Sequence, residues 1–248
     1  MSAKDYSQSK QQLVLTIPCN DEACFANFCW TGNELLRQQI MSLIPMLADS
    51  RQSPSQLFQD QGQVIYLWGE SGFGKSHLLQ AICHDLGQSA AYLPLQLLKD
   101  WDPGILDGMD DCVLVAVDDV EEVVGHSAWE EALFHLYNRL STQQHMLIVT
   151  GKVPPSATAI RLADLRSRLT SALILQMHEL SDEDKVRTLQ NHAKKRGLDL
   201  PKMVGQYILS RCARNMHDLH SILDRLDHAS LVTQRKLTIP FVKDILAV

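Results

Sequence analysis

The stretch VIYLWGESGFGKSHLLQ, residues 64–80, decides the fold of this chain. Residues 69–76 fit the pattern G-x-x-x-x-G-K-[ST] at every defined position, after an apolar run of strand length and before an amphipathic helix. A glycine-rich loop in this context turns backbone N–H groups and the positive end of a helix toward phosphate. The stretch therefore predicts a P-loop nucleotide site, rather than a glycine turn with a surface lysine.

Each residue type of the motif has a task in phosphate binding. Glycines let the backbone curl around a phosphate chain, the lysine neutralises the outer phosphates, and the serine hydroxyl is a ligand for Mg²⁺. We expect the loop and the residue after it to contact the nucleotide, with Ser76 also on the magnesium ion. The expected nucleotide-binding residues are Gly69, Glu70, Ser71, Gly72, Phe73, Gly74, Lys75, Ser76 and His77.

Apolar runs of strand length recur up to residue 176. They are continuous rather than alternating, which indicates strands buried on both faces of a sheet. Helical stretches lie between them, near 75–86, 95–107, 127–141 and 160–169, and such alternation is typical of a parallel sheet covered by helices. We expect a three-layer P-loop α/β domain with a parallel five-stranded sheet, its strands at 64–68, 90–94, 113–117, 146–150 and 172–176.

The charge distribution indicates a second domain. Residues 1–180 carry 11 basic and 21 acidic side chains, a net charge of −10, whereas residues 181–248 carry 12 and 8, a net charge of +4. Strand-like runs stop at the same point. We therefore expect a flexible tail at 1–22, a nucleotide-binding domain at 23–179 and a small all-helical lid domain at 180–248.

Capping residues mark the expected helices outside the strand-rich region. Near the N-terminus, Asn33 is expected to cap a helix that ends around Pro45. In the lid domain, Gly197 is expected to close the first helix. The expected helix starts there are at Ser181, Pro201, Asn215 and Pro240.

Bulk composition narrows the class of protein. The 248 residues are 45% hydrophobic, and the net charge of −6 argues against a protein that mainly binds DNA phosphates. Neither a secretory signal nor an apolar run of bilayer length is present, so we expect a cytoplasmic protein without membrane contact. Six cysteines without a C-x-x-C pair disfavour zinc and redox chemistry. His217 and His220 form a helix-spaced pair, for which exposed helix positions are a better interpretation than a metal site.

Two aspartates end the apolar run VLVAVDD, residues 113–119. Such a pair is often only a polar turn. In a P-loop sheet, however, it lies beside the phosphate loop, where Asp118 would hold Mg²⁺ through water and Asp119 would orient the attacking water. The position of the pair after the P-loop favours the metal site.

These features together resemble the AAA+ ATPase family, and longer blocks resemble its DnaA branch. VAVDDVEEVVG…WEEALFHLYNRL, residues 115–140, shares with DnaA the aspartate pair, Gly125 and an E-x-x-F-H-x-x-N spacing. FANFCWTGNELL, residues 25–36, loosely resembles the segment that lines the adenine pocket. LADLRSRL, residues 162–169, resembles the block whose arginine reaches a neighbouring subunit's nucleotide, which implies Arg168 as an arginine finger in trans. Taken alone, Arg168 would be a surface arginine.

The resemblance also implies nucleotide contacts by sensor residues. Thr150 stands at the sensor position that ends a strand, and His217 stands where the lid arginine of the family is expected. Arg214 lies three residues earlier, and residues three apart share a helix face, so we expect it to substitute. Asp119 replaces the usual catalytic glutamate, and Lys152 stands where DnaA has aspartate. These departures imply weak or partner-dependent ATPase activity.

Within the DnaA branch the chain resembles the Hda family of regulators of replication initiation. Matching runs outside the catalytic motifs include YLPL (92–95), LDGM (106–109), HELSDEDK (178–185) and QRKLTIPFVK (234–243). The resemblance implies a DNA replication inhibitor that binds ADP or ATP with Mg²⁺, although the P-loop would also hold another nucleoside diphosphate. It implies DnaA and the sliding clamp (beta) of DNA polymerase III as partners, with DNA contacted only indirectly at the nucleoid. A homo-oligomer is compatible with it.

The run QQLVLTIP, residues 11–18, lies in a polar leader. It is either the first strand of the fold or an extended hook for another protein. The Hda resemblance favours the hook, because that family carries a Gln-Leu-x-Leu clamp-binding motif, which here is Gln12, Leu13, Val14 and Leu15.

Three classes of function fit these patterns. The leading hypothesis is a regulator that presents Arg168 to ATP held by DnaA and so inactivates the initiator. The second is a self-sufficient AAA+ ATPase such as a helicase- or clamp-loader-like motor. The third is a small-molecule P-loop kinase, which is disfavoured because the sequence does not indicate a pocket for a second substrate.

Overall fold

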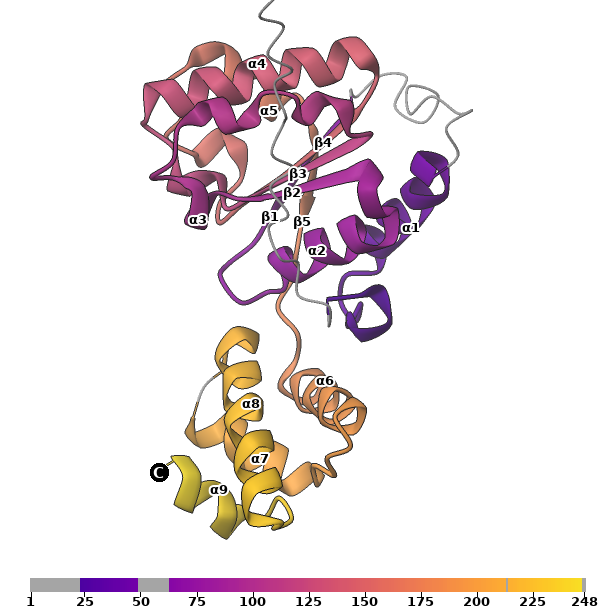
Figure 1. Ribbon diagram of the computed structural model, residues 1–248, viewed down its shortest axis with the longest axis vertical. Helices are drawn as coiled ribbons and strands as arrows, with labels where there is room; N and C mark the ends of the chain where they lie inside the picture. Colours follow the sequence, from indigo (N-terminus) through magenta and orange to yellow (C-terminus); the bar gives the residue numbers. More distant parts are fainter. Residues whose placement is uncertain (1–22, 49–62, 213, 247–248) are drawn as a thin grey trace, which may run out of the picture.

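The computed structural model describes residues 23–48, 63–212 and 214–246 (Figure 1). Five strands in these ranges form one parallel sheet, as predicted, and their order is β2-β3-β4-β1-β5. Strand β1 therefore lies between β4 and β5, and one strand separates it from β3. The strands are β1 (Val64–Trp68), β2 (Ala90–Pro94), β3 (Leu114–Asp118), β4 (Met146–Gly151) and β5 (Leu173–Gln176).

Helices cover both faces of the sheet (Figure 1). Alternate residues of each strand point to opposite faces, so Ile65 and Leu67 lie in one core while Tyr66 lies in the other. The first core is closed by α1 (Glu34–Ala48) and α2 (Lys75–Leu86). The second is closed by α3 (Leu95–Leu98), α4 (Ser127–Gln143) and α5 (Ala163–Thr170).

A separate helical domain follows β5, which the chain reaches through one extended segment (Figure 1). Its helices are α6 (Asp182–Lys195), α7 (Lys202–Arg211), α8 (Met216–Thr233) and α9 (Ile239–Leu246). They enclose an apolar core of their own, with Leu189, Leu223 and Phe241 almost completely buried. The composition shift near residue 180 thus coincides with the segment that joins the two cores.

Local capping chemistry forms the lid helices as predicted. The Ser181 hydroxyl accepts a hydrogen bond from the backbone N–H of Asp184 at 3.1 Å, and the Asn215 side chain accepts one from Asp218 at 2.8 Å. Gly197 follows α6 with a φ of +76°, as expected for a residue that ends a helix.

Two predicted helix ends were wrong. Helix α1 continues through Pro45 to Ala48, because Leu43, Ile44 and Leu47 all pack into the core and burial outweighs one missing N–H donor. The helix expected at 95–107 ends instead at Leu98.

A turn replaces the second half of that expected helix. The Asp102 carboxylate accepts a hydrogen bond from the backbone N–H of Gly104 at 2.6 Å, and a short 3₁₀ helix, Pro103–Leu106, follows. Proline and glycine in succession favour this turn over a continuing α-helix.

Asn33 has a role that its position before α1 does not indicate. Its side-chain oxygen accepts a hydrogen bond from the backbone N–H of His178 at 2.8 Å, and its amide nitrogen donates to the His178 carbonyl at 3.1 Å. The buried amide therefore ties the start of α1 to the segment that leads to the lid.

Candidate nucleotide-binding site

The predicted P-loop lies between β1 and α2, in a conformation that requires glycine. Gly74 precedes the helix with a φ of +102°, where a side chain would be strained. Gly72 has a φ of +83°, and a Cβ there would lie 2.8 Å from the Cβ of Asn215 in the lid. The loop can therefore curl only because these positions lack side chains, and it contacts the lid at Gly72.

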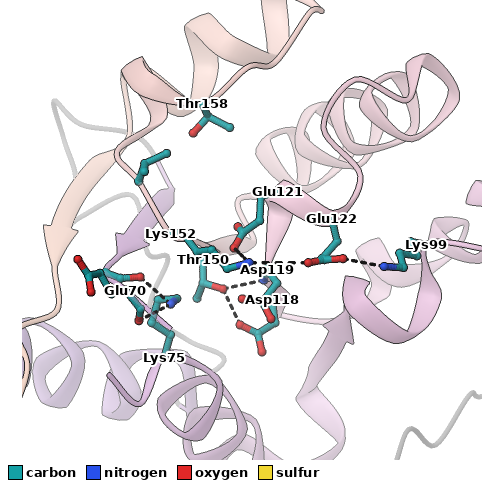
Figure 2. A network of polar contacts seen from close by, with 12 residues as sticks. Glu70, Lys75, Lys99, Asp118, Asp119, Glu121, Glu122, Thr150, Lys152 and Thr158 are labelled. Atoms are coloured by element: carbon teal, nitrogen blue, oxygen red, sulfur yellow. Dashed lines mark hydrogen bonds and ion pairs between the residues drawn. The ribbon is translucent and has the colours of Figure 1, made fainter. Parts of the chain in front are cut away.

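Lys75 lies across the loop that it follows (Figure 2). Its ammonium group donates to the carbonyl oxygens of Gly69 at 2.7 Å and Glu70 at 3.0 Å. Burial lowers the pKa of Lys75, and the carboxylates of Asp119 and Glu121 oppose this shift. An ammonium has three donors, so one N–H remains for an anion in the loop.

Asp118 and Thr150 form a buried pair at the ends of adjacent strands, β3 and β4 (Figure 2). The Thr150 hydroxyl donates to one carboxylate oxygen of Asp118 at 2.5 Å, and the Tyr92 hydroxyl from β2 donates to the other at 2.7 Å. Gln80 of α2 donates in turn to the Tyr92 oxygen at 3.1 Å. The Asp118 carboxylate is thus held by donors from two neighbouring strands.

Asp119 is the first residue beyond β3 and has a left-handed conformation, with a φ of 56°. Its backbone N–H donates to the Thr150 hydroxyl at 2.9 Å, which fixes this turn. Burial first, and then the adjacent Asp118 carboxylate, raises the pKa of Asp119 to about 6. A carboxylate of this pKa is poised to accept a proton near neutral pH.

Lys152 lies beside this network but turns to other partners (Figure 2). Its ammonium lies 3.3 Å from a carboxylate oxygen of Glu121 and 3.8 Å from one of Glu122. Glu122 also pairs with Lys99 at 2.8 Å. Lys152 therefore joins an acidic cluster next to the site.

A cleft of about 390 Å³ opens beside the P-loop. One wall is the loop and the start of α2, a second is the segment before α1, and a third comes from the lid helices α6 and α8. Among the predicted residues, the cleft is lined by Ser71, Gly72, Phe73, Gly74, Lys75, Ser76, His77, Asp119 and His217. The fold therefore brings most of the predicted P-loop residues and the predicted lid residue His217 to one cleft.

Flat rings form another part of the cleft lining. Phe28 meets His77 edge-on with ring centroids 5.6 Å apart, and the His192 ring lies 6.4 Å from His77 and 4.4 Å from His220. Such rings offer faces and edges for a planar base. Phe28 belongs to the segment that resembles the adenine pocket of DnaA. The sequence did not predict that His192 and His220 line the cleft.

The lid residues near the P-loop divide between two pockets. His217 is exposed on α8 and lines the cleft, whereas Arg214 lines a neighbouring pocket with Glu70 and Lys185. The expectation that Arg214 shares a helix face with His217 is wrong, because Asn215 is the N-cap and α8 begins at Met216. His220 is partly buried against His192, so it is not the exposed helix position that we expected.

The donor set at the strand ends fits a magnesium ion held as the P-loop motif implies. Ser76 is among the residues that line the cleft, and the Asp118 carboxylate keeps unused lone pairs after two hydroxyl bonds. Ser76 would bind the ion directly and Asp118 through water.

Arg168 lies away from the cleft that the P-loop forms. It is exposed on α5, and its guanidinium lies over the Tyr137 ring at 5.4 Å from the centroid. The predicted clamp-binding residues Gln12, Leu13 and Leu15 lie outside the described residues.

Tyr92, Gln80 and Glu130 are polar residues of this region that sequence reasoning missed. Tyr92 carried a signal, since it is a lone hydroxyl in the apolar run next to the strand that ends in Asp118. Glu130 carried none, because two of its three backbone partners, Arg161 and Leu162, lie more than 30 residues away.

The described residues also bear on metal centres, disulfides and membrane spans. No set of three or more histidine, cysteine or acidic side chains there is arranged to bind a metal ion, and the five cysteines described are free thiols. None of the helices in these ranges has the length and apolar character of a bilayer span.

Two stretches of the chain match family models. Residues 182–246 match the model described as Hda, lid domain, which takes in α6 to α9. Residues 65–160 match a model described as RNA helicase, and they contain both the P-loop and Asp118.

Solved structures share the fold over most of the chain. Domain III of DnaA from Thermotoga maritima aligns with a TM-score of 0.75 and 18% identity over 93% of this chain and 98% of its own. AMPPCP-bound DnaA from Aquifex aeolicus aligns at 0.64 and 20% identity over 83% and 65%. The RuvB Holliday junction branch migration motor from Thermotoga maritima aligns at 0.62 and 14% identity over 87% and 69%.

Proposed function

We propose that this chain, whose residues 182–246 match the Hda lid domain model and whose fold resembles domain III of DnaA, is an AAA+ protein of the DnaA branch that regulates replication initiation by acting on nucleotide held by DnaA. In this proposal it binds ADP or ATP in its own cleft and docks on the sliding clamp. It then stimulates hydrolysis of DnaA-bound ATP, which leaves an inactive initiator.

Nucleotide binding by the chain is supported by the complete loop between β1 and α2. Lys75, Ser76 and Asp119 face one cleft, and the structurally similar Aquifex aeolicus DnaA binds AMPPCP. The lid closes the same cleft through α6 and α8, so a bound nucleotide would contact both domains. The nucleotide would then fix the lid relative to the sheet as well as serve any chemistry.

The observation that carries the regulatory proposal is the position of Arg168. Its side chain is exposed on α5 and is not among the residues that line the cleft. An arginine that cannot serve the chain's own nucleotide is free to enter a partner's site. There a guanidinium stabilises the charge that builds on the transferring phosphoryl group, an effect worth about 10³–10⁵ in rate in other systems.

Clamp docking rests on the resemblance of residues 12–15 to the family motif. Apolar side chains of a peptide fill a groove on its partner, and here Leu13 and Leu15 would do so with Gln12 at the rim. DnaA and the clamp would then meet this chain on DNA, without direct DNA binding by a protein of net charge −6.

A self-sufficient AAA+ motor is the alternative. It is favoured by the match of residues 65–160 to an RNA helicase model and by the likeness to the RuvB motor. Asp119, with its raised pKa beside the P-loop, would be the base in that case.

ATP turnover separates these functions. We expect the purified chain alone to hydrolyse ATP slowly, and DnaA preloaded with ATP to lose it rapidly once the chain and DNA-loaded clamp are added together. The control is the same mixture without clamp. Rapid turnover by the chain alone, with no added effect of DnaA and clamp, would favour the motor instead.

A further inference from the structure

Glu130 is a buried carboxylate on α4 that binds the backbone at the start of α5. It is only 1% exposed. One oxygen accepts from the N–H of Gly125 at 2.7 Å, and the other accepts from the N–H groups of Arg161 at 3.0 Å and Leu162 at 2.7 Å. Burial alone would raise the pKa of Glu130, but these donors outweigh it and lower the pKa.

Tyr137 lies two turns further along α4 and contacts the last turn of α5. Its ring lies beneath the guanidinium of Arg168, with 5.4 Å from the carbon to the centroid. This is within the range of a cation–π interaction. The planar guanidinium keeps its N–H donors free at the edges while its face rests on the ring.

The spacing of Glu130 and Tyr137 along α4 matches the spacing of their partners, Leu162 and Arg168, along α5. Residues seven apart lie on the same side of an α-helix, about 10 Å from each other. Leu162 and Arg168, six apart, span about 9 Å along α5. Between the two contacts, Leu133 packs in the same apolar core as Leu165 and Leu169.

We propose that Glu130 and Tyr137 are positioning residues that hold α5 at both ends and so present Arg168 to the partner's nucleotide. The proposal rests on the proposed function, since it gives the arginine a role in trans. Glu130 fixes where α5 begins, and Tyr137 limits the rotamers of an exposed arginine. A finger ordered before docking loses less side-chain entropy when it enters the partner's site.

The test is the maximal rate at which saturating chain and DNA-loaded clamp stimulate hydrolysis of DnaA-bound ATP. Tyr137→Leu should lower this rate about two- to fivefold, the value of an exposed cation–π contact. Tyr137→Phe keeps the ring and should retain the wild-type rate. The concentration for half-maximal stimulation should stay unchanged in both, because docking is not altered.

Tyr137→Gln gives a second ring-free variant if Tyr137→Leu is poorly folded.

Glu130→Gln places an amide donor among N–H donors, and should lower the stimulated rate while leaving ADP affinity intact, since Glu130 does not line the cleft. A wild-type rate in the ring-free variants, or a Tyr137→Phe rate as low as theirs, overturns the role of Tyr137. A wild-type rate in Glu130→Gln overturns that of Glu130. Stimulation that survives Arg168→Ala would instead defeat the proposed function.

Discussion

Thr150 joins the two aspartates that end β3. Its side chain is completely buried, and one hydroxyl both donates to the Asp118 carboxylate and accepts from the Asp119 N–H. Because β4 lies between β3 and β1, Thr150 also pairs in register with Leu67 of the P-loop strand. Thr150 therefore holds the Asp118 carboxylate and the turn at Asp119 in place.

Replacing Thr150 by valine should leave both partners of this hydroxyl unsatisfied. We expect the free energy of unfolding to fall by about 1–3 kcal/mol, since valine keeps the volume but not the hydrogen bonds. Affinity for Mg-ADP should fall as well, because Asp118 loses one of its two donors. Urea denaturation and titration calorimetry measure these effects. Thr142→Val on the exposed side of α4 is the control, and an effect no larger than that of the control would contradict this account.

Helices α2, α6 and α8 meet through histidine rings at the cleft. Burial lowers the pKa of His77, and burial with the nearby His192 lowers that of His220 to about 4. These histidines are therefore neutral in the folded protein at neutral pH. Protonation would place like charges between the sheet domain and the lid, next to Lys195 and Arg196.

This arrangement predicts acid sensitivity of the lid. The folded-state pKa of His220 lies below its ordinary value of 6.5, so its contribution to stability is complete above pH 6.5 and is lost as the pH falls toward about 4. The midpoint of thermal unfolding should decline over this window. Because His220→Gln removes the titrating ring, it should make this decline less steep. Asp119 has a raised pKa, so its contribution to stability increases as the pH falls below 6 and opposes the decline in both proteins.

The comparison that isolates His220 uses a second histidine of the same helix. His228 is exposed on α8, so His228→Gln should retain the wild-type pH dependence. Equal slopes for wild type, His220→Gln and His228→Gln would show that the buried ring contributes nothing.

The elements that sequence predicted well are those determined by neighbouring residues. Helix α2 and strands β1 and β2 have the predicted bounds, and Ser181 and Asn215 cap their helices, because the deciding contacts lie within a few residues. The end of α1 was missed since burial of its last turn outweighed a local proline effect.

Contacts between distant segments explain the polar contacts that the sequence did not predict. Asn33 binds His178, 145 residues away, and Tyr92 reaches Asp118 from the adjacent strand, 26 residues earlier in the chain. The sequence pattern could place Asp118 at the P-loop edge of the sheet, but not the hydroxyls that hold it. The ring-lined part of the cleft likewise needs the packing of lid against sheet, which no short pattern encodes.

Across the whole molecule, the two proposed functional sites lie apart. The cleft between sheet and lid has the phosphate loop, the ring-lined wall and His217, whereas Arg168 lies apart on α5, which contacts α4 through Glu130 and Tyr137. A nucleotide in the cleft would therefore act on the shape of the chain, and the exposed arginine would act on another protein. This division is the central claim of the account.

The most direct measurement is single-turnover hydrolysis of ATP preloaded on DnaA, with DNA-loaded clamp and either the wild-type chain, Arg168→Ala or Arg166→Ala. Arg166 is exposed on the same helix, two residues away, and serves as the matched control. We expect Arg168→Ala to reduce the rate to that of DnaA alone while binding ADP normally, and Arg166→Ala to stimulate like the wild type. Full stimulation by Arg168→Ala would contradict the claim.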